Sequence, residues 1–217
     1  MPEDQLKIKP GKAPKGYFVT AISTDSGKTL VSALLCRALD ADYWKPVQAG
    51  LPRDTETVQH LAALNETRIH RETYLLPTPE SPHAAAHRAG MKIEQASFKL
   101  PATEKILIVE GAGGLLVPLN PDFFVADLIQ QLGLPVILVC NLYLGSINHS
   151  LLSIAELKRR NISIKGIVFN GESNTYSESI ILQIAEAPCL LRLFPEAVLN
   201  ESVLEHYASE LRSNLAN

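Results

Sequence analysis

The stretch Tyr17–Leu30 reads YFVTAISTDSGKTL and joins an apolar run to the start of a periodic segment through a loop of small and polar residues. The apolar run, Tyr17–Ile22, has the short length and composition of a buried strand. From Thr29 to Leu39, apolar residues recur with helical spacing directly after a glycine. The sequence therefore predicts a strand, a short loop and a helix.

The loop ends in Gly27-Lys28-Thr29, which is typical of a phosphate-binding loop. Gly27 lets the backbone approach an anion, and the amides at the helix N-terminus point towards it. Lys28 would reach the terminal phosphates of a nucleotide, and the Thr29 hydroxyl would bind its magnesium ion. A chance Gly-Lys-Thr in a surface turn is disfavoured by the strand before it and the helix after it. The pattern G-x-x-x-x-G-K-[ST] would place a glycine at Ile22, whereas the small residue is Ala21, so the loop is either one residue longer than usual or degenerate.

Further short apolar runs have the character of buried parallel strands: Ile106–Val109, Val136–Cys140 and Ile164–Phe169. Between them, Val125–Leu132 and Leu151–Arg160 have helical spacing. Strands that alternate with helices indicate βαβ units. Together with the phosphate loop, this alternation predicts a single α/β domain of the P-loop NTPase type, with a mostly parallel sheet flanked by helices on both faces.

The segment from Leu51 to Leu100 departs from this alternation, because it holds several prolines and one charged, helix-like stretch, Asp54–Leu64. We interpret it as an insertion over the carboxyl edge of the sheet, where open α/β sheets bind ligands. One domain is therefore expected over residues 1–217, and its polar first part, residues 1–15, is expected to be a flexible N-terminal extension.

The composition argues against several classes of protein. Twenty basic and 23 acidic residues give a net charge of −3, which does not favour nucleic acid as a partner. No apolar run approaches the ~18 residues that cross a bilayer, so no membrane association is expected. The three cysteines, Cys36, Cys140 and Cys189, lack metal-type spacing and are expected to be buried thiols in a reducing compartment. We predict a soluble, cytoplasmic protein.

A second polar element follows the apolar run that begins at Ile106. Glu110 ends this run and is followed by the glycine-rich turn Gly111–Gly114. A carboxylate at the end of a strand beside a phosphate loop is where nucleotide enzymes hold a metal ion, and the glycines permit close approach of a ligand. The alternative is a glutamate that caps the turn; the glycines favour the functional interpretation.

These elements belong to a set of five motifs that occur in the order found in dethiobiotin synthetases, the ring-closing enzymes of biotin biosynthesis. The motifs are Thr24–Thr29 (TDSGKT), Trp44–Gly50 (WKPVQAG), Ser81–His83 (SPH), Glu110–Gly114 (EGAGG) and Gly145–His149 (GSINH). The chain resembles this family over about two-thirds of its length. It departs from the family pattern at Ala21 and Ser23, where members usually carry Gly and Asp, and at Ala49, where many carry Ser or Thr.

The resemblance implies an ATP- and Mg²⁺-dependent ligase. Its substrates would be 7,8-diaminononanoate and CO₂ or bicarbonate, joined as a carbamate on one amine. ATP would phosphorylate the carbamate to a carbamic–phosphoric anhydride, and the second amine would close the ureido ring to give dethiobiotin, ADP and phosphate. Cations and amide dipoles must then converge on the transferred phosphoryl group, because the carbamate and the triphosphate are both anions.

The resemblance also assigns roles to residues. The catalytic set is Lys45, Lys28 and Thr24, with Lys45 on the carbamate side. The ATP-binding set is Asp25, Ser26, Gly27, Lys28, Thr29, Leu30 and Asn170. Asn170 would read the adenine edge, although capping a turn is an equally ordinary role for Asn. The metal ligands would be Thr29, Asp54 and Glu110, and the substrate would contact Lys45, Ala49, Gly111, Gly113, Gly145, Ser146 and Asn148.

His83 and His149 receive no catalytic role, since neither has metal spacing or a partner for nucleophilic catalysis; the segment Ser81–His83 is expected to shape the substrate pocket. The segment Gly145–His149 precedes the expected helix Ser150–Arg160, and its amides could bind an anion. By resemblance, the partner subunit of a homodimer supplies this helix terminus to a shared active site. The alternative is that it caps its own helix.

Two other functions share the nucleotide machinery. One is another small-molecule ligase or kinase with a phosphate loop, although a simple kinase gives no reason for Lys45 and the Glu110 turn together. The other is a partitioning-type ATPase switch, which would usually carry a second lysine early in its phosphate loop; this loop has none. ATP turnover that requires the diamine and bicarbonate would distinguish the ligase from both.

Overall fold

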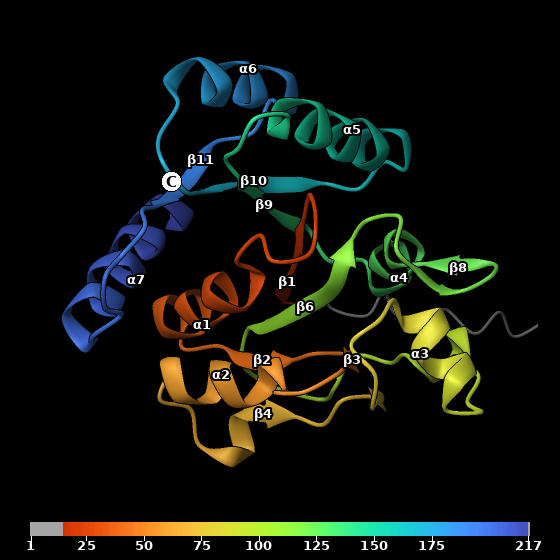
Figure 1. The fold of residues 1–217 in the computed structure, drawn as a ribbon. Coiled ribbons are helices and arrows are strands. Elements are labelled where there is room, and N and C mark those ends of the chain that lie inside the picture. Colours follow the sequence, from red (N-terminus) through yellow and green to blue (C-terminus); the bar gives the residue numbers. More distant parts are fainter. Residues whose placement is uncertain (1–14, 217) are drawn as a thin grey trace, which may run out of the picture.

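A computed structural model of the chain describes residues 15–216, and a parallel seven-stranded sheet runs through its centre (Figure 1). The strands lie in the order β11-β10-β9-β1-β6-β2-β4, which confirms the predicted α/β fold. Their bounds are β1 Gly16–Ala21, β2 Asp42–Trp44, β4 Ile69–His70, β6 Leu107–Gly114, β9 Val136–Asn141, β10 Ile164–Asn170 and β11 Cys189–Leu193. The first fourteen residues of the predicted N-terminal extension lie outside the described residues.

Helices cover both faces of the sheet. Successive strand residues point to opposite faces and are apolar on both, so each face must be buried. Phe18 and Val109 pack in one apolar cluster, and Val19 and Ile108 pack in the other. The first face is covered by α4 (Val125–Leu132), α5 (Ser146–Arg159) and α6 (Thr175–Ala185). The second is covered by α1 (Lys28–Leu39), α2 (Asp54–Leu61) and α7 (Glu201–Ala216).

The predicted insertion takes part in the core of the domain rather than only lying over its edge. Within Leu51–Leu100, β4 extends the central sheet and α2 packs against α1. The rest of the insertion forms smaller elements: β5 Tyr74–Leu76, which pairs with β3 Val47–Ala49 just before the insertion, and α3 Pro82–Arg88. Further along the chain, β7 Pro118–Asn120 and β8 Phe123–Phe124 form a hairpin. Single 3₁₀ turns lie at Glu66–Arg68 and Gln95–Ser97. These elements lack strong periodicity, which is why sequence alone did not define them.

Several boundaries differ from the predictions for identifiable reasons. Helix α5 begins at Ser146, so the motif Gly145–His149 is its N-cap and first turn rather than a segment before the helix. Strand β6 continues through the glycines to Gly114, because backbone pairing with β1 resumes after a bulge. The three cysteines are unpaired, as expected, but Cys189 is only half-buried. Within the described part of the chain, no helix is long and apolar enough to cross a membrane.

A charged cluster fixes the amino end of β2, opposite to the end that carries Lys45. Buried Asp42 accepts hydrogen bonds from the Arg68 guanidinium and, at 2.6 Å, from the Thr103 hydroxyl. Burial opposes ionisation of Asp42, but these two donors outweigh it and lower the pKa of the carboxyl. Asp40 next to it is exposed and pairs with the same arginine.

We predict that Asp42→Asn lowers the free energy of unfolding by about 3 kcal/mol, because it leaves Arg68 largely buried without its main counter-charge. The stabilisation is present above the ordinary pKa of the carboxyl and disappears as the pH falls through its lowered value. Asp40→Asn is the matched control and should cost about 0–1 kcal/mol, as exposed pairs do. Urea unfolding of both variants measures the difference; equal losses would contradict the assignment.

Candidate active site

The phosphate loop connects β1 to α1 and depends on Gly27. This residue is the N-cap of α1 and has φ 98°, a conformation that side chains rarely tolerate. A Cβ atom added there would lie 2.5 Å from Nδ2 of Asn170. The loop therefore turns into the helix at the only type of residue that fits, and the first amides of α1 face the loop opening.

The loop is tied to the carboxyl ends of two neighbouring strands. The Ser26 hydroxyl lies 2.7 Å from Oδ1 of Asn141 at the end of β9, and Nδ2 of Asn170 at the end of β10 donates to the Ser26 carbonyl at 2.9 Å. Lys28 folds over the loop and donates to the Ser23 carbonyl at 3.1 Å. Asn170 thus contacts the backbone of the loop, which is a supporting role that sequence reasoning did not separate from reading adenine.

Lys28 is a buried ammonium, and nearby carboxylates offset only part of the cost of removing its charge from water. Burial lowers its pKa from 10.5 to about 8, and the nearby Glu110 carboxylate opposes the shift only in part. An anionic ligand at the loop would favour the protonated form. The residue therefore has the electrostatics of a phosphate-binding lysine.

Strand alternation gathers the second set of functional side chains on the α1 face. On β2, Tyr43 points to this face, and Lys45 follows two residues later. On the adjacent β6, Ile108 points to the same face and Glu110 follows two residues later. Thr29 stands opposite, in the first turn of α1. The residues therefore meet because two parallel strands and one helix N-terminus end at the same edge of the sheet.

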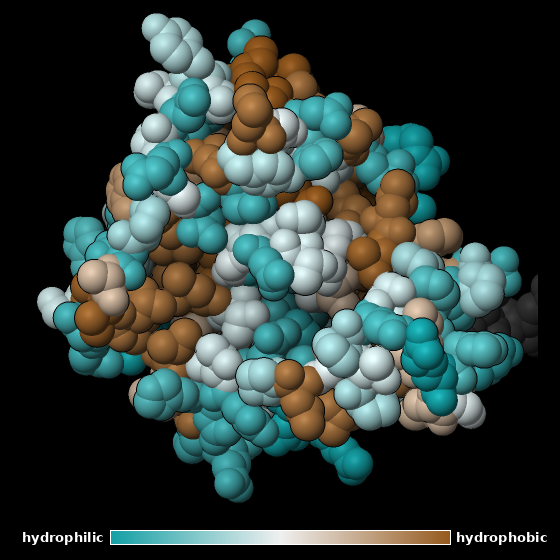
Figure 2. Space-filling view, in the orientation of Figure 1, coloured by the Kyte–Doolittle hydropathy of each residue, from teal (hydrophilic) through white to brown (hydrophobic). Residues whose placement is uncertain are grey.

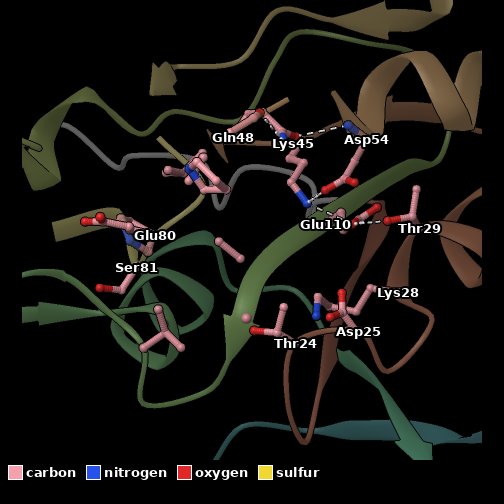
Figure 3. A pocket seen from close by; sticks show the side chains of 18 of the residues that line it. Thr24, Asp25, Lys28, Thr29, Lys45, Gln48, Asp54, Glu80, Ser81 and Glu110 are labelled. Carbon is pink, nitrogen blue, oxygen red and sulfur yellow. Dashed lines mark hydrogen bonds and ion pairs between the residues drawn. The ribbon is translucent and has the colours of Figure 1, made fainter. Parts of the chain in front are cut away.

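Figure 3 shows Lys45 directed at Asp54 and Glu110 on the upper side of the cavity. Nζ of Lys45 lies 2.9 Å from Oε1 of Glu110 and also forms an ion pair with Asp54. The Thr29 hydroxyl donates to the same Glu110 oxygen at 3.0 Å. Although burial disfavours the charged amine, the two carboxylates outweigh it and raise the pKa of Lys45. This lysine is a permanent cation held by two carboxylates.

The three predicted metal ligands fit a magnesium ion. Carboxylate oxygens of Asp54 and Glu110 both contact the Lys45 ammonium, so a cation is stable at this position, and the Thr29 hydroxyl reaches it through its hydrogen bond to the same oxygen of Glu110. Hydroxyl and carboxylate oxygens are the donors that Mg²⁺ prefers, usually in company with phosphate oxygens and water. In residues 15–216 there is no cluster of three or more His, Cys, Asp or Glu side chains that could hold a metal by itself. The phosphates of a nucleotide would have to complete the site.

A cavity of about 790 Å³ opens beside these residues and joins the two halves of the site. Lys28 and Lys45 both line it, and Thr24 and Asp25 lie exposed at its lower side in Figure 3. Its other walls come from the end of β3 and the predicted insertion, and from the glycine-rich strand and the turn after it: Ala49–Pro52, Pro79–Pro82, Ala112, Gly113 and Val117. A volume of this size can hold a nucleotide phosphate chain and a small substrate together.

Other predicted site residues have different positions. Gly111 lies outside the lining of this cavity; a Cβ there would come within 2.9 Å of the Phe18 ring, so it permits close packing. The partly buried Leu30 side chain packs against the core and does not line this cavity. Ser81 and Pro82 line the cavity, as expected for the SPH motif, whereas His83 lines a separate groove beside α3.

The GSINH motif lines a second cavity of about 710 Å³ between the first turns of α5 and α6. Gly145, Ser146 and Asn148 contribute to it, and no residue lines both this cavity and the one at the phosphate loop. Within one described chain, these three residues are therefore not part of the main cavity. His149 is absent from this second cavity; it contacts the hydroxyl of Tyr143 at 2.5 Å and lines a separate groove with Thr24 and Val117.

Two residues of the site were missed by sequence reasoning. Gln48 accepts a hydrogen bond from the Asp54 amide at 3.1 Å and donates to the Gly50 carbonyl, so it sets the start of α2. The Tyr43 hydroxyl donates to Oε2 of Glu110 at 2.9 Å. Burial, together with Glu110, raises the pKa of Tyr43, so the phenol keeps its proton. The sequence did hold a signal for Tyr43: it lies two residues before Lys45, so in a strand its side chain is on the same face as that of Lys45.

Comparisons with known proteins agree with this geometry. A family model described as an AAA domain matches residues 15–202. The ATP-dependent dethiobiotin synthetase of Cytophaga hutchinsonii is 56% identical over 92% of this chain and 98% of its own length. The chain belongs to the dethiobiotin synthetase family. The family enzyme of Christiangramia forsetii is 45% identical over 93% of this chain and 98% of its own length. This confirms the resemblance predicted from the five motifs.

Solved structures of more distant proteins show the fold alone. A plasmid partition protein of Borrelia burgdorferi bound to AMPPNP aligns with a TM-score of 0.53 and 13% identity, over 94% of this chain and 97% of that one. A chain of the MinC:MinD cell division protein complex of Aquifex aeolicus aligns with a TM-score of 0.52 and 13% identity, over 94% of this chain and 96% of that one. The dethiobiotin synthetase sequence thus lies on a widely used phosphate-loop scaffold.

We predict that Asn170→Ala weakens binding of tripolyphosphate and of ATP by the same factor, about tenfold, because Asn170 supports the loop backbone at Ser26. Isothermal titration calorimetry with both ligands checks this. If Asn170 instead reads adenine, ATP affinity falls while tripolyphosphate affinity is unchanged. Ser177→Ala is the control. It removes a polar side chain from α6, away from the loop, and should alter neither affinity.

Proposed function

We propose that the chain closes the ureido ring of dethiobiotin from 7,8-diaminononanoate and CO₂, with ATP as the phosphoryl donor. The observation that carries the proposal is the pair of lysines in one cavity. Lys28 belongs to the phosphate loop, and Lys45 is held by Asp54 and Glu110 on the opposite side. A reaction between a triphosphate and a second anion needs this arrangement, because each anion requires its own counter-charge. The family relatives support the same activity.

In the proposed reaction, a carbamate formed on one amine attacks the γ-phosphorus of ATP, and ADP leaves. The product is a carbamic–phosphoric anhydride. The second amine attacks its carbonyl carbon, phosphate leaves, and the ring is closed. Lys45 would stabilise the carbamate and the transferring phosphoryl group, while Lys28 would hold the β- and γ-phosphates and Thr24 would supply a hydroxyl beside them.

Magnesium would be held by Thr29, Asp54 and Glu110, and when bound it would neutralise charge on the phosphates. Lys45 interacts with the same two carboxylates, which would keep its ammonium beside the metal ligands and on the carbamate side of the cavity. Ala49 and Gly113, which line the cavity, would border the diamine end of the substrate. The backbone of residues 25–30 would surround the phosphates.

The carboxylate end of the substrate is proposed to bind a second subunit. Diaminononanoate places its carboxylate about seven carbons from the amines, and the cavity lined by Gly145, Ser146 and Asn148 is separate from the phosphate-loop cavity of its own chain. Apolar side chains are exposed in and beside that motif, among them Ile147 and Leu144. Figure 2 shows apolar side chains at the top of the molecule, over α5 and α6. A homodimer in which each chain donates the same surface would bury them and complete both sites.

The alternative functions are less well supported. Partition-type ATPases share the fold at 13% identity, which carries no information about activity. A simple kinase needs no cation such as Lys45 in addition to the phosphate loop. The substrate requirement of ATP turnover distinguishes these possibilities.

The central prediction is that ADP release requires 7,8-diaminononanoate and bicarbonate together, and that Lys28→Met and Lys45→Met impair it differently. Lys28→Met should weaken ATP binding at least about tenfold, since it removes a phosphate contact. Lys45→Met should leave ATP affinity within about threefold but reduce turnover about 100-fold or more, because its contribution arises on the carbamate side. Coupled ADP assays and nucleotide titrations measure both effects.

ADP release at the full rate without the diamine would refute the ligase proposal. Equal loss of ATP affinity in the two variants would refute the division of roles between the lysines. Lys165→Met, a substitution on β10 outside the cavity lining, is a control for the loss of a lysine charge.

A second prediction concerns the shared site. Lys45→Met and Asn148→Asp should each be inactive alone, the latter because its new negative charge repels the substrate carboxylate. Mixed dimers then contain one intact site, made from Lys45 of one chain and Asn148 of the other. Random mixing should restore about one quarter of wild-type activity, since half of the dimers are mixed and each has one working site. Mixed dimers that form, as seen by native mass spectrometry, but stay inactive would refute the shared site.

A further inference from the structure

The buried phenol of Tyr43 contacts one of the proposed magnesium ligands from the side opposite to the cavity. Its hydroxyl donates to Oε2 of Glu110 at 2.9 Å, and the side chain is inaccessible to solvent. The other carboxylate oxygen, Oε1, accepts from Thr29 at 3.0 Å and from Lys45 at 2.9 Å. The two oxygens of Glu110 thus have different surroundings: one faces the cavity residues and the other faces the core.

We propose that Tyr43 is a positioning residue for the metal site, which holds Oε2 of Glu110 in the core so that Oε1 is presented to the metal. The inference rests on the proposed function, in which Glu110 is a magnesium ligand. It concerns a residue that does not itself line the cavity.

The Glu110 carboxylate needs a hydrogen-bond donor at Oε2 because it could otherwise rotate. The terminal torsion of a glutamate is soft and roughly twofold, so a carboxylate held only at Oε1 can turn about its axis. The hydrogen bond at Oε2 gives the group a second fixed point, and any rotation then breaks contacts on both sides. Outer hydrogen bonds of this kind orient the carboxylate ligands of metal ions and influence metal affinity.

The position of Tyr43 in the sheet makes the contact rigid. β2 lies directly beside β6, with Tyr43 paired to Ile108, two residues before Glu110 on the same face. The Tyr43 ring packs in the apolar cluster beneath α1, so the phenol has no freedom to leave. Strand pairing therefore sets the distance between Tyr43 and Glu110, and packing of the ring fixes the position of the hydroxyl.

The test compares Tyr43→Phe with Tyr207→Phe. Tyr207 is a matched control, because it is a buried phenol in the same apolar cluster and donates to a glutamate, Glu196, that lies outside the site. Both variants should unfold at a lower temperature than the wild type. Only Tyr43→Phe should weaken Mn²⁺ binding in the presence of saturating ADP, by about five- to tenfold, as measured by electron paramagnetic resonance of free Mn²⁺. ADP affinity without metal should be unchanged in both.

A double-variant cycle shows whether Tyr43 acts through Glu110. In a Glu110→Gln background, adding Tyr43→Phe should produce no further loss of Mn²⁺ affinity, because the carboxylate that Tyr43 positions is gone. Tyr43→Met also lacks the hydroxyl and fills the space with a flexible side chain, so it serves as a second variant if Tyr43→Phe does not fold.

Three results would overturn the proposal: Mn²⁺ affinity within twofold of wild type in folded Tyr43→Phe, equal weakening in Tyr207→Phe, or full additivity with Glu110→Gln. Failure of both Tyr43 variants to fold would also overturn it, in favour of a purely structural hydroxyl. These measurements require no dethiobiotin formation. The inference and the proposed reaction can therefore fail independently.

Discussion

A buried pair of opposite charges, Lys45 and Glu110, is the constraint on which the site depends. Both side chains are almost inaccessible to solvent, and their Nζ and Oε1 atoms are 2.9 Å apart. Burying either charge without the other would be strongly destabilising, because taking an ion out of water costs several kcal/mol unless an opposite charge compensates for it. Each residue therefore requires the other, and the strands that carry them, β2 and β6, must lie side by side.

The geometry around this pair follows from the need to satisfy it. Glu110 has two oxygens and three donors: Thr29 and Lys45 at one oxygen, and Tyr43 at the other. Asp54 adds a second carboxylate to Lys45 from the start of α2, whose first amide is held by Gln48. The predicted insertion is therefore more than a cover for the sheet edge. It supplies Asp54, the second of the two carboxylates that, after Glu110, raise the pKa of Lys45.

The lysine of the phosphate loop, Lys28, has different electrostatic surroundings from Lys45. Lys28 is buried with less compensation than Lys45, and burial lowers its pKa to about 8, while the two carboxylates raise that of Lys45. The first lysine is thus better suited to a ligand that brings its own negative charge, and the second to a site that already carries it. In the proposed function, this contrast separates Lys28, which would bind the nucleotide, from Lys45, which would act on the reacting anion.

The sequence alone determined the features that depend on local pattern: the strand, loop and helix at Tyr17–Leu39, the alternation that gives a parallel sheet, and the five family motifs. It also identified Thr29, Asp54 and Glu110 as a set; in the structure Thr29 contacts Glu110, and Lys45 links Glu110 to Asp54. Only the tertiary structure decided which side chains share a strand face across neighbouring strands, and so revealed Tyr43, Gln48 and the packing role of Gly111. It also decided that Gly145–Asn148 start a helix away from the main cavity. The physical reason is that strand pairing and register bring together residues far apart in the chain. The periodicity of one segment does not show which segments will lie beside it.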